Sequence, residues 1–250
     1  MRLKNRVAMI TGAGGPMGRA IALRFAEEGA NLVLTDISER RLEETKQILT
    51  VLKKDVIAVR SNVLNYDEVK SVVANAYTHM DKIDILINVV GGIRSQPMNQ
   101  SILEIDGDRW DDTMALNMKG SVNCIQLVAP QMIKGQYGKI VNISSIGFAG
   151  EAGLSDYGAA KAGVASLTKT AAIELSPYVN VNCIAPGIIQ TSITTRMEQS
   201  ELESYRNQTL TGRLGEPIDI ANTALFLSNE ESRNITGQII AVSGGISPHL

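Results

Sequence analysis

The sequence has few of the residues that mark disulfide-rich, metal-binding or membrane-inserted proteins. Its 250 residues include only two cysteines, Cys124 and Cys183, in widely separated apolar contexts, and two histidines, His79 and His249. Such spacing forms neither a disulfide framework nor a metal-ligand cluster, so we expect no metal site. Nowhere do about 18 apolar residues run together, and the apolar run after Met1 is too short for a signal peptide. We therefore expect a cytoplasmic protein with no membrane partner.

A large charge of either sign is also absent. The chain has 24 Lys and Arg residues against 26 Asp and Glu residues, which gives a net charge of −2. This balance provides no electrostatic reason to expect nucleic acid or an anionic membrane as partner. A content of 44% hydrophobic residues is that of an ordinary globular protein.

No internal repeat, low-complexity tract or linker divides the chain. Length alone permits one large α/β domain or two small ones. We expect a single domain over residues 1–250, in which residues 1–145 form the cofactor half and residues 146–250 form the catalytic and substrate half.

Short apolar runs alternate with helical patterns from one end of the chain to the other. The alternation predicts parallel strands with helices on both faces, which is a doubly wound, seven-stranded α/β sheet. The predicted strands are 7–10, 31–35, 56–60, 85–88, 139–143, 179–185 and 238–242. The predicted helices are 17–28, 39–52, 66–80, 108–133, 156–175 and 217–228. Two segments without strong periodicity, 91–105 and 186–212, follow strands and are the expected substrate walls.

The first predicted strand runs into a glycine-rich turn and then directly into a helix. Residues 11–18 read Thr-Gly-Ala-Gly-Gly-Pro-Met-Gly. Glycines allow a tight turn and a close backbone approach to a pyrophosphate, while the helix N-terminus supplies free N–H groups and a positive dipole end. The context favours dinucleotide binding over a tight packing loop.

Asp36 closes the second predicted strand. An acid there can accept hydrogen bonds from both ribose hydroxyls of an adenosine, and its charge repels the 2′-phosphate of NADP. NAD is therefore favoured, whereas NADP stays open because Arg40 and Arg41 are near. A helix N-cap is the other interpretation of Asp36, although Ser38 is better placed for that role.

A second candidate site follows the fifth predicted strand. Tyr157 and Lys161 are four positions apart at the start of a predicted helix, so they share one face. A nearby ammonium favours the phenolate of a tyrosine, so the pair can supply or remove a proton near neutral pH. Ser144, at the end of the preceding strand, could hold a substrate oxygen. Taken alone, such a pair is usually two solvated side chains.

Together these motifs resemble the classical short-chain dehydrogenase/reductase family over essentially the whole chain. The family's Thr-Gly-x-x-x-Gly-x-Gly turn matches residues 11–18 except at Pro16, and its Asn-Asn-Ala-Gly stands at residues 88–91 as Asn-Val-Val-Gly. Its Tyr-x-x-x-Lys is Tyr157 to Lys161, preceded by its serine at Ser144. The remaining matches are Asn117, Pro-Gly-Ile-Ile-Gln-Thr at 186–191, Gly-Arg-Leu-Gly-Glu-Pro at 212–217 and Ile-Thr-Gly-Gln at 235–238. Several matches in the right order are far more specific than any single one.

The resemblance implies a single-domain Rossmann fold and a known division of labour among four residues. Tyr157 would be the general acid/base, Lys161 would lower its pKa and bind the nicotinamide ribose, and Ser144 would orient the substrate oxygen. Asn117 would hold a water that links Lys161 to solvent. The implied cofactor-binding residues are Gly12, Gly14, Gly15, Met17, Gly18, Asp36, Ile37, Asn62, Val63, Asn88, Val89, Gly91, Tyr157, Lys161, Pro186, Gly187, Ile189 and Thr191.

Several positions depart from the family pattern. Pro16 fixes φ and removes an N–H, which suits a first helical turn but leaves phosphate contacts to neighbours such as Met17. Val89 and Val90 replace Asn and Ala, and Asn62 stands where an Asp often contacts adenine; its amide still offers a donor and an acceptor. These departures bear on cofactor geometry and leave the four catalytic positions intact.

Residues expected to face the substrate are mostly apolar, which favours a neutral, moderately hydrophobic secondary alcohol or ketone. These residues are Ile93, Arg94, Ile146, Phe148, Leu154, Ile188, Ile193 and Met197. The alternative is that several of them pack against the sheet. Arg94 and Arg196 are alternative contacts for a carboxylate or a carrier's phosphate.

The leading interpretation is an NAD(H)-dependent alcohol dehydrogenase or ketoreductase with a small-molecule substrate. The first alternative is a 3-oxoacyl-thioester reductase using NADPH, against which Asp36 and the slightly acidic charge argue. The second is a nucleotide sensor without chemistry, against which the retained catalytic set argues. The resemblance also implies a homotetramer, because members of the family commonly assemble as tetramers.

Overall fold

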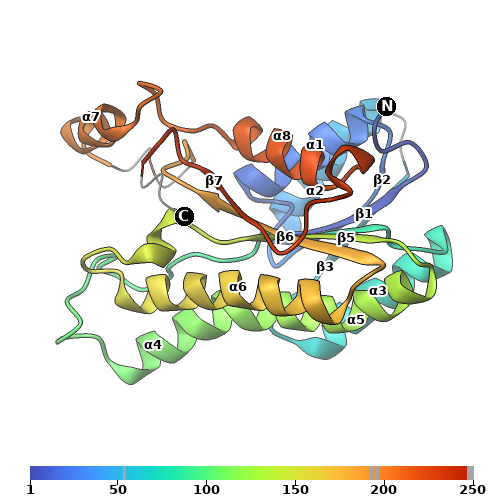
Figure 1. The fold of residues 1–250 in the computed structure, drawn as a ribbon, viewed down its shortest axis with the longest axis horizontal. Helices are drawn as coiled ribbons and strands as arrows, with labels where there is room; N and C mark the ends of the chain where they lie inside the picture. Colours follow the sequence, from blue (N-terminus) through green and yellow to red (C-terminus); the bar gives the residue numbers. More distant parts are fainter. Residues whose placement is uncertain (53–54, 192–193, 195–196, 247–250) are drawn as a thin grey trace.

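A computed structural model describes residues 1–52, 55–191, 194 and 197–246. Within this part of the chain, seven strands form one sheet in the order β3-β2-β1-β4-β5-β6-β7 (Figure 1), and every neighbouring pair is parallel. The strands are β1 (Val7–Thr11), β2 (Asn31–Asp36), β3 (Val56–Arg60), β4 (Ile85–Asn88), β5 (Gly138–Ile143), β6 (Val179–Pro186) and β7 (Ile239–Val242). The predicted seven-stranded parallel α/β fold is confirmed.

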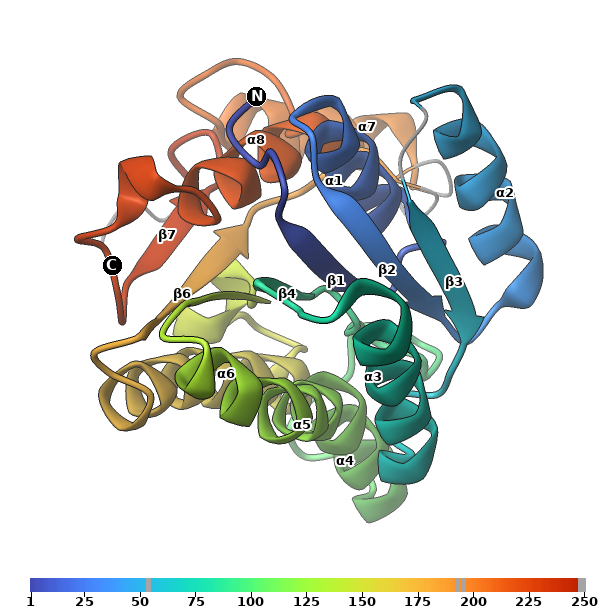
Figure 2. The same ribbon diagram turned by 90° about the vertical axis from the view of Figure 1, so that its right-hand side faces the viewer.

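Helices cover both faces of the sheet (Figure 2). On one face lie α1 (Pro16–Glu27), α2 (Glu39–Leu49) and α8 (Pro217–Leu227), and on the other lie α3 (Tyr66–Met80), α4 (Gly107–Met114), α5 (Gly120–Lys134) and α6 (Ser155–Glu174). Each face has its own cluster of buried apolar side chains, with Phe25 and Leu225 in the first and Val72 and Val128 in the second. Burial on both faces explains why the strands read as continuous apolar runs.

Side-chain caps fix where several helices begin. The Asn65 side chain accepts hydrogen bonds from the backbone of Asp67 and Glu68 at the start of α3, as its position in the sequence indicates. At the start of α8, Glu216 and Asp219 form a reciprocal capping box around Pro217.

The predicted helix 108–133 is not one regular helix. Between α4 and α5 the chain forms a π-helical segment, Ala115–Lys119. The predicted helix 39–52 also ends early, because α2 stops at Leu49 and residues Thr50–Leu52 form a 3₁₀ turn. Neither the π-helical segment nor the 3₁₀ turn interrupts the pattern of apolar residues, so the sequence could not predict them.

One helix was missed altogether. Helix α7 (Gln199–Gln208) lies inside the segment 186–212 that showed no clear periodicity. No residue of α7 is buried, so the helix has no apolar face from which to predict it. The other segment, 91–105, contains no helix or strand, as expected.

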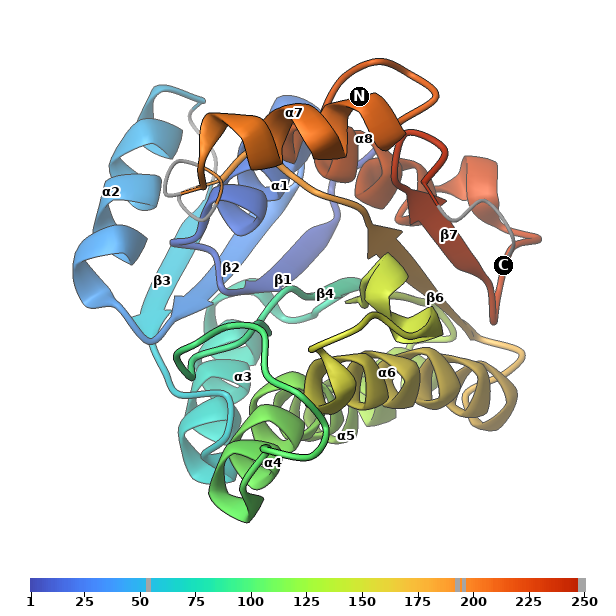
Figure 3. The same ribbon diagram turned by 90° about the vertical axis from the view of Figure 1, so that its left-hand side faces the viewer.

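The sheet topology brings distant segments to one edge. Strand β1 pairs with β2 on one side and β4 on the other, so the winding direction reverses between these strands, and such a switch point is where ligands bind in parallel sheets. Figure 3, seen from the carboxyl ends of the strands, shows α7 on one side of this edge and the loop after β4 with the start of α6 on the other. The two expected substrate walls therefore face each other.

No helix in the described ranges is long and apolar enough to cross a membrane.

Candidate active site

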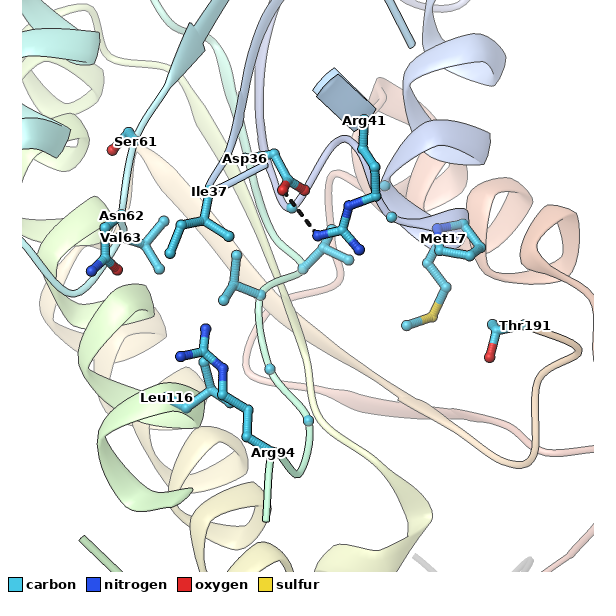
Figure 4. A pocket seen from close by; sticks show the side chains of 18 of the residues that line it. Met17, Asp36, Ile37, Arg41, Ser61, Asn62, Val63, Arg94, Leu116 and Thr191 are labelled. Carbon is cyan, nitrogen blue, oxygen red and sulfur yellow. Dashed lines mark hydrogen bonds and ion pairs between the residues drawn. The ribbon is translucent and has the colours of Figure 1, made fainter. Parts of the chain in front are cut away.

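A cavity of about 330 Å³ opens at the switch point (Figure 4). Most residues that line it come from the glycine-rich turn, the ends of β2 and β3, and the loop after β4; α2, the π-helical segment and the segment after β6 contribute one residue each. The lining residues are Gly12, Gly15, Pro16, Met17, Gly18, Asp36, Ile37, Arg41, Ser61, Asn62, Val63, Val89, Val90, Gly91, Gly92, Ile93, Arg94, Leu116 and Thr191. Most of the predicted cofactor-binding residues thus meet in one place.

The glycine-rich turn has the shape that a pyrophosphate requires. Gly12 adopts a φ of +64°, and a Cβ on Gly18 would lie 2.2 Å from the carbonyl oxygen of Gly12, so only glycine lets α1 approach the strand end this closely. The first turn of α1 has no side-chain cap and no acidic residue, so its N–H groups and positive dipole end remain available to an anion. Pro16 occupies the first helical turn, where its missing N–H costs no intrahelical bond.

Asp36 is buried beside this turn and is held by three donors. One carboxylate oxygen accepts the N–H of Gly14 at 3.0 Å, and the other accepts the N–H of Ser38 at 2.8 Å and Nη2 of Arg41 at 3.3 Å. Ser38 caps α2, as its position in the sequence indicates. The cavity therefore presents a fixed carboxylate next to a half-exposed guanidinium (Figure 4).

At the end of β3 the predicted Asn62 lies next to Ser61, a polar residue that sequence analysis missed. The Ser61 hydroxyl lines the cavity, is buried and has no hydrogen-bond partner among the described residues. The carbonyl of the Asn62 side chain accepts the N–H of Leu64 at 3.1 Å, while its Nδ2 makes no hydrogen bond within the described chain. A free hydroxyl and a free amide N–H can both contact a purine base.

The four expected catalytic side chains converge on the ends of β4 and β5. The Ser144 hydroxyl donates to the carbonyl of Lys161 at 2.8 Å, and Nζ of Lys161 donates to the carbonyl of Ile143 at 2.9 Å. The same Nζ lies 5.6 Å from the centre of the Tyr157 ring. Asn117 extends from the π-helical segment toward the same place, a setting in which functional residues often occur.

Gly91 packs against both Lys161 and Asn117. A Cβ at this position would lie 2.6 Å from Nζ of Lys161 and 2.7 Å from Oδ1 of Asn117. Asn117 also accepts the N–H of Gly92 at 2.8 Å and donates to the Gly92 carbonyl at 2.9 Å. The loop after β4 is thus fixed by Asn117 and depends on having no side chain at residue 91.

Burial dominates the protonation of this cluster. It lowers the pKa of Lys161 to about 8, with a small opposing effect of the Cys183 thiol. It also raises the pKa of Tyr157, with the Ser145 side chain acting in the opposite direction and Glu151 adding to the rise. In this arrangement burial is the largest influence on the Tyr157 pKa, and Lys161 donates to the carbonyl of Ile143. A lowering of the Tyr157 pKa by Lys161 stays a prediction.

Other predicted cofactor residues lie around the cavity without lining it. Gly14 packs against Arg41, Asn88 donates to Asn142 at 2.9 Å, and Ile189 is buried in the apolar cluster of α1 and α8. Pro186 ends β6, and Gly187 donates its N–H to the carbonyl of Val242 at 3.0 Å.

The predicted substrate residues divide into three groups. Ile93 and Arg94 line the cavity. Five others are half-buried and do not line it, namely Ile146, Phe148, Leu154, Ile188 and Met197. Ile193, and with it Arg196, lies outside the described residues.

Comparison with known proteins agrees with this geometry. Residues 12–247 match a family model described as enoyl-(acyl carrier protein) reductase. The chain is 38% identical, over 99% of its length and 98% of the relative's, to the hydroxy(phenyl)methylsuccinyl-CoA dehydrogenase subunit BbsD of Thauera aromatica. It is 37% identical to the 3-oxoacyl-acyl-carrier-protein reductase FabG of Thermotoga maritima, over 98% and 99% of the two chains. The chain belongs to the short-chain dehydrogenase/reductase family.

A solved structure supports the same assignment. The chain superposes on 7α-hydroxysteroid dehydrogenase with a TM-score of 0.92 and 31% identity, over 98% and 95% of the two chains. That structure is a complex with NADH and 7-oxo glycochenodeoxycholic acid. As a short-chain dehydrogenase/reductase, the protein is an NAD(P)-dependent oxidoreductase that acts on CH–OH donors.

Gly91→Ala should strongly impair this short-chain dehydrogenase/reductase. The new methyl group would displace Lys161 or Asn117, and we expect kcat/KM for ketone reduction to fall about 100-fold, as for a displacement near 1 Å in a catalytic group. The value of kcat/KM would be measured from the steady-state rate at which the reduced cofactor is oxidised. Gly107→Ala is the matched control, because nothing lies within 4 Å of its added Cβ. Wild-type kcat/KM in the Gly91 variant would contradict the packing argument.

Proposed function

We propose that the protein transfers hydride between NAD(H) and a secondary alcohol or ketone, with Tyr157 as the general acid/base. The observation that carries the proposal is the convergence of Asn117, Ser144, Tyr157 and Lys161 beside a cavity whose glycine-rich turn fits a pyrophosphate. The bound nicotinamide supplies or accepts the hydride. The protein's residues bind and orient both reactants and move the proton.

Burial of Tyr157 suits the reducing direction. The phenol is protonated at neutral pH, and burial raises its pKa further from neutrality. This is the form that can donate a proton to a carbonyl oxygen as the hydride arrives. Ser144 is buried at the end of β5 and would hold that oxygen through its hydroxyl. In the oxidising direction the phenolate of Tyr157, stabilised by the buried ammonium of Lys161, takes the proton from the alcohol and becomes a phenol.

Asn117 completes the proposed proton path. Its amide is fixed by Gly92 and by the carbonyl of Thr113 at 2.8 Å, and its Oδ1 lies on the same side of Gly91 as the ammonium of Lys161. A water held by this amide would pass a proton between Lys161 and solvent.

NAD is the proposed cofactor because of Asp36. Its buried carboxylate lies in the cavity wall and repels the additional phosphate of NADP. The structurally similar 7α-hydroxysteroid dehydrogenase, whose complex contains NADH, supports this preference. NADP is the second candidate, and the observation in its favour is Arg41, which lines the same cavity and pairs with Asp36.

The proposed substrate is a small ketone or secondary alcohol. The second candidate is a 3-oxoacyl thioester, because two similar proteins bear the names of a CoA-thioester dehydrogenase and an acyl-carrier-protein reductase. Arg94 is exposed in the cavity, with neither a hydrogen bond nor an ion pair to the described residues. Its guanidinium points toward the cavity from the side opposite Asp36 (Figure 4), where it could meet a carboxylate or a phosphate.

Three further features of the proposal concern the whole chain. We propose one domain over residues 1–250, a homotetramer and a cytoplasmic location. Support for assembly comes from apolar side chains exposed on and after α5 and α6, namely Ile133, Ile173 and Tyr178. The free, buried thiols of Cys124 and Cys183 suit a reducing compartment.

A substrate panel tests the activity directly. Cyclohexanone, a steroid ketone and acetoacetyl-CoA would each be offered with NADH and with NADPH, and loss of absorbance of the reduced cofactor would be followed. We expect turnover of at least one ketone with NADH. Turnover restricted to acetoacetyl-CoA would select the thioester reductase, and cofactor binding without any turnover would support the nucleotide sensor instead.

Tyr157→Phe should abolish hydride transfer and leave NADH binding intact. The variant removes only the hydroxyl that handles the proton, so we expect kcat to fall by a factor of about 100 or more, while the dissociation constant of NADH, measured by fluorescence, stays within about twofold of wild type. Tyr178→Phe is the matched control, since Tyr178 precedes β6 at the opposite edge of the sheet. An active Tyr157→Phe enzyme would remove this residue from its proposed role.

Asp36→Ala should weaken the preference for NAD. Loss of the carboxylate removes the repulsion and releases Arg41 to bind a 2′-phosphate, so the ratio of kcat/KM for NADH over NADPH should fall about tenfold or more. Adding Arg41→Ala should reverse the gain with NADPH. Adding Arg40→Ala instead should not, because Arg40 pairs with Glu44 and does not line the cavity. Equal use of both cofactors by the wild type would contradict the assignment.

A further inference from the structure

A buried ion pair joins α4 to the start of α6 beneath the loop after β4. Arg109 is 5% exposed and Asp156 is fully buried, with Nε of the arginine 2.9 Å from Oδ2 of the aspartate. The Thr113 hydroxyl donates to the same oxygen at 3.0 Å. Neither charged residue lines the cavity, so neither belongs to the site already described.

The other guanidinium N–H groups of Arg109 hold the loop. Nη1 donates to the carbonyl of Pro97 at 2.7 Å and to Oε1 of Gln100 at 3.0 Å, and Nη2 donates to the carbonyl of Met98 at 2.8 Å. The loop has no helix or strand of its own, so these bonds fix its course between residues 97 and 100. A lysine could not replace them, because only the planar fork of arginine reaches three acceptors while pairing with a carboxylate.

The pair also contacts the immediate neighbours of the proposed catalytic residues. Oδ1 of Asp156 accepts the backbone N–H of Tyr157 at 2.8 Å. Thr113, which donates to Asp156, accepts the side-chain amide of Asn117 on its carbonyl. One cluster therefore connects the substrate-side loop, the first turn of the catalytic helix and the π-helical segment.

A purely stabilising role does not account for this arrangement. Burying two charges is costly, and well-packed apolar side chains are often as stabilising or more so. Here three of the four hydrogen bonds of the guanidinium go to an irregular loop, two of them to backbone carbonyls. An apolar pair could not make these hydrogen bonds, which fix the position of the loop relative to the backbone of Tyr157.

We propose that Arg109 and Asp156 are positioning residues that hold loop 97–100 as a fixed substrate wall relative to the Tyr157 hydroxyl. This inference rests on the proposed function for its kinetic consequences, since it assumes that Tyr157 protonates the substrate. The pair touches neither substrate nor cofactor. It acts on how the carbonyl group of the substrate is presented to the phenol.

Kinetics of two variants separate positioning from stability. Arg109→Met leaves the Asp156 carboxylate buried and unpaired, so the thermal midpoint should fall. With the best substrate of the panel, KM should rise about tenfold and kcat should also fall, while the dissociation constant of NADH stays within about twofold. Arg24→Met is the control, because Arg24 lies on α1 and pairs with Glu28 just after that helix, away from the loop.

The decisive variant is Arg109→Met combined with Asp156→Asn. It removes the unpaired buried charge, so the thermal midpoint should recover, yet the loop carbonyls still lack their donor and KM should remain raised. Recovery of KM together with stability would overturn the proposal and leave the pair a structural one. An unchanged KM in both variants would overturn it as well.

Amide hydrogen exchange tests whether Arg109 and Asp156 hold loop 97–100, even if no panel substrate is turned over. In both variants, exchange should become faster in peptides covering 97–104 and stay unchanged in peptides covering the glycine-rich turn. Unchanged exchange in 97–104 would overturn the inference, whatever the outcome of the substrate panel. Faster exchange without turnover would support the role of the pair in holding the loop, and it would count against the proposed function alone.

Discussion

The reciprocal hydrogen bonds between Asn117 and the backbone of Gly92 hold the site in one piece. They attach the π-helical segment to the loop after β4, and that loop passes directly over Lys161. Because Gly91 has no Cβ, the ammonium and the amide can lie close together beneath the backbone. The position of the loop then determines where Ile93 and Arg94 meet the cavity. The hydrogen bonds of Asn117 and the lack of a side chain at Gly91 thus both determine where this loop lies.

Electrostatics in this site are governed by removal from water more than by pairing. Lys161 and Tyr157 both have pKa values moved toward their neutral forms, and burial is the main cause in each case. On the cofactor side, the carboxylate of Asp36 and the guanidinium of Arg41 instead hold each other at 3.3 Å. The two halves of the site therefore differ in character: the proposed proton-transfer centre is desolvated, whereas the proposed nucleotide pocket beside it is charged and half-exposed.

The sequence was sufficient to predict the sheet, and it named most of the residues that the fold brings together in the candidate site. Parallel strands are buried on both faces and read as unbroken apolar runs, and glycine turns and helix caps mark their ends. Helix α7 escaped prediction because it buries no side chain. The π-helical segment escaped prediction because it adds one residue to a helical turn, and no residue type in the sequence marks that change. Arg109 could not be singled out, since a charged residue in a predicted helix gives no sign that its partners lie in a distant loop and in α6.

The absence of buried residues in α7 has a consequence for how the protein can diverge. Substitutions along this helix remove no core contact, so they leave the free energy of unfolding almost unchanged. The loop on the opposite side of the carboxyl edge is tied through Arg109 to two helices and tolerates far less change. Helix α7 and this loop are the proposed walls of the substrate pocket. Selection for new substrates would therefore reshape the α7 side, while the loop keeps the reaction geometry constant. A library restricted to α7 is the natural starting point for altering specificity.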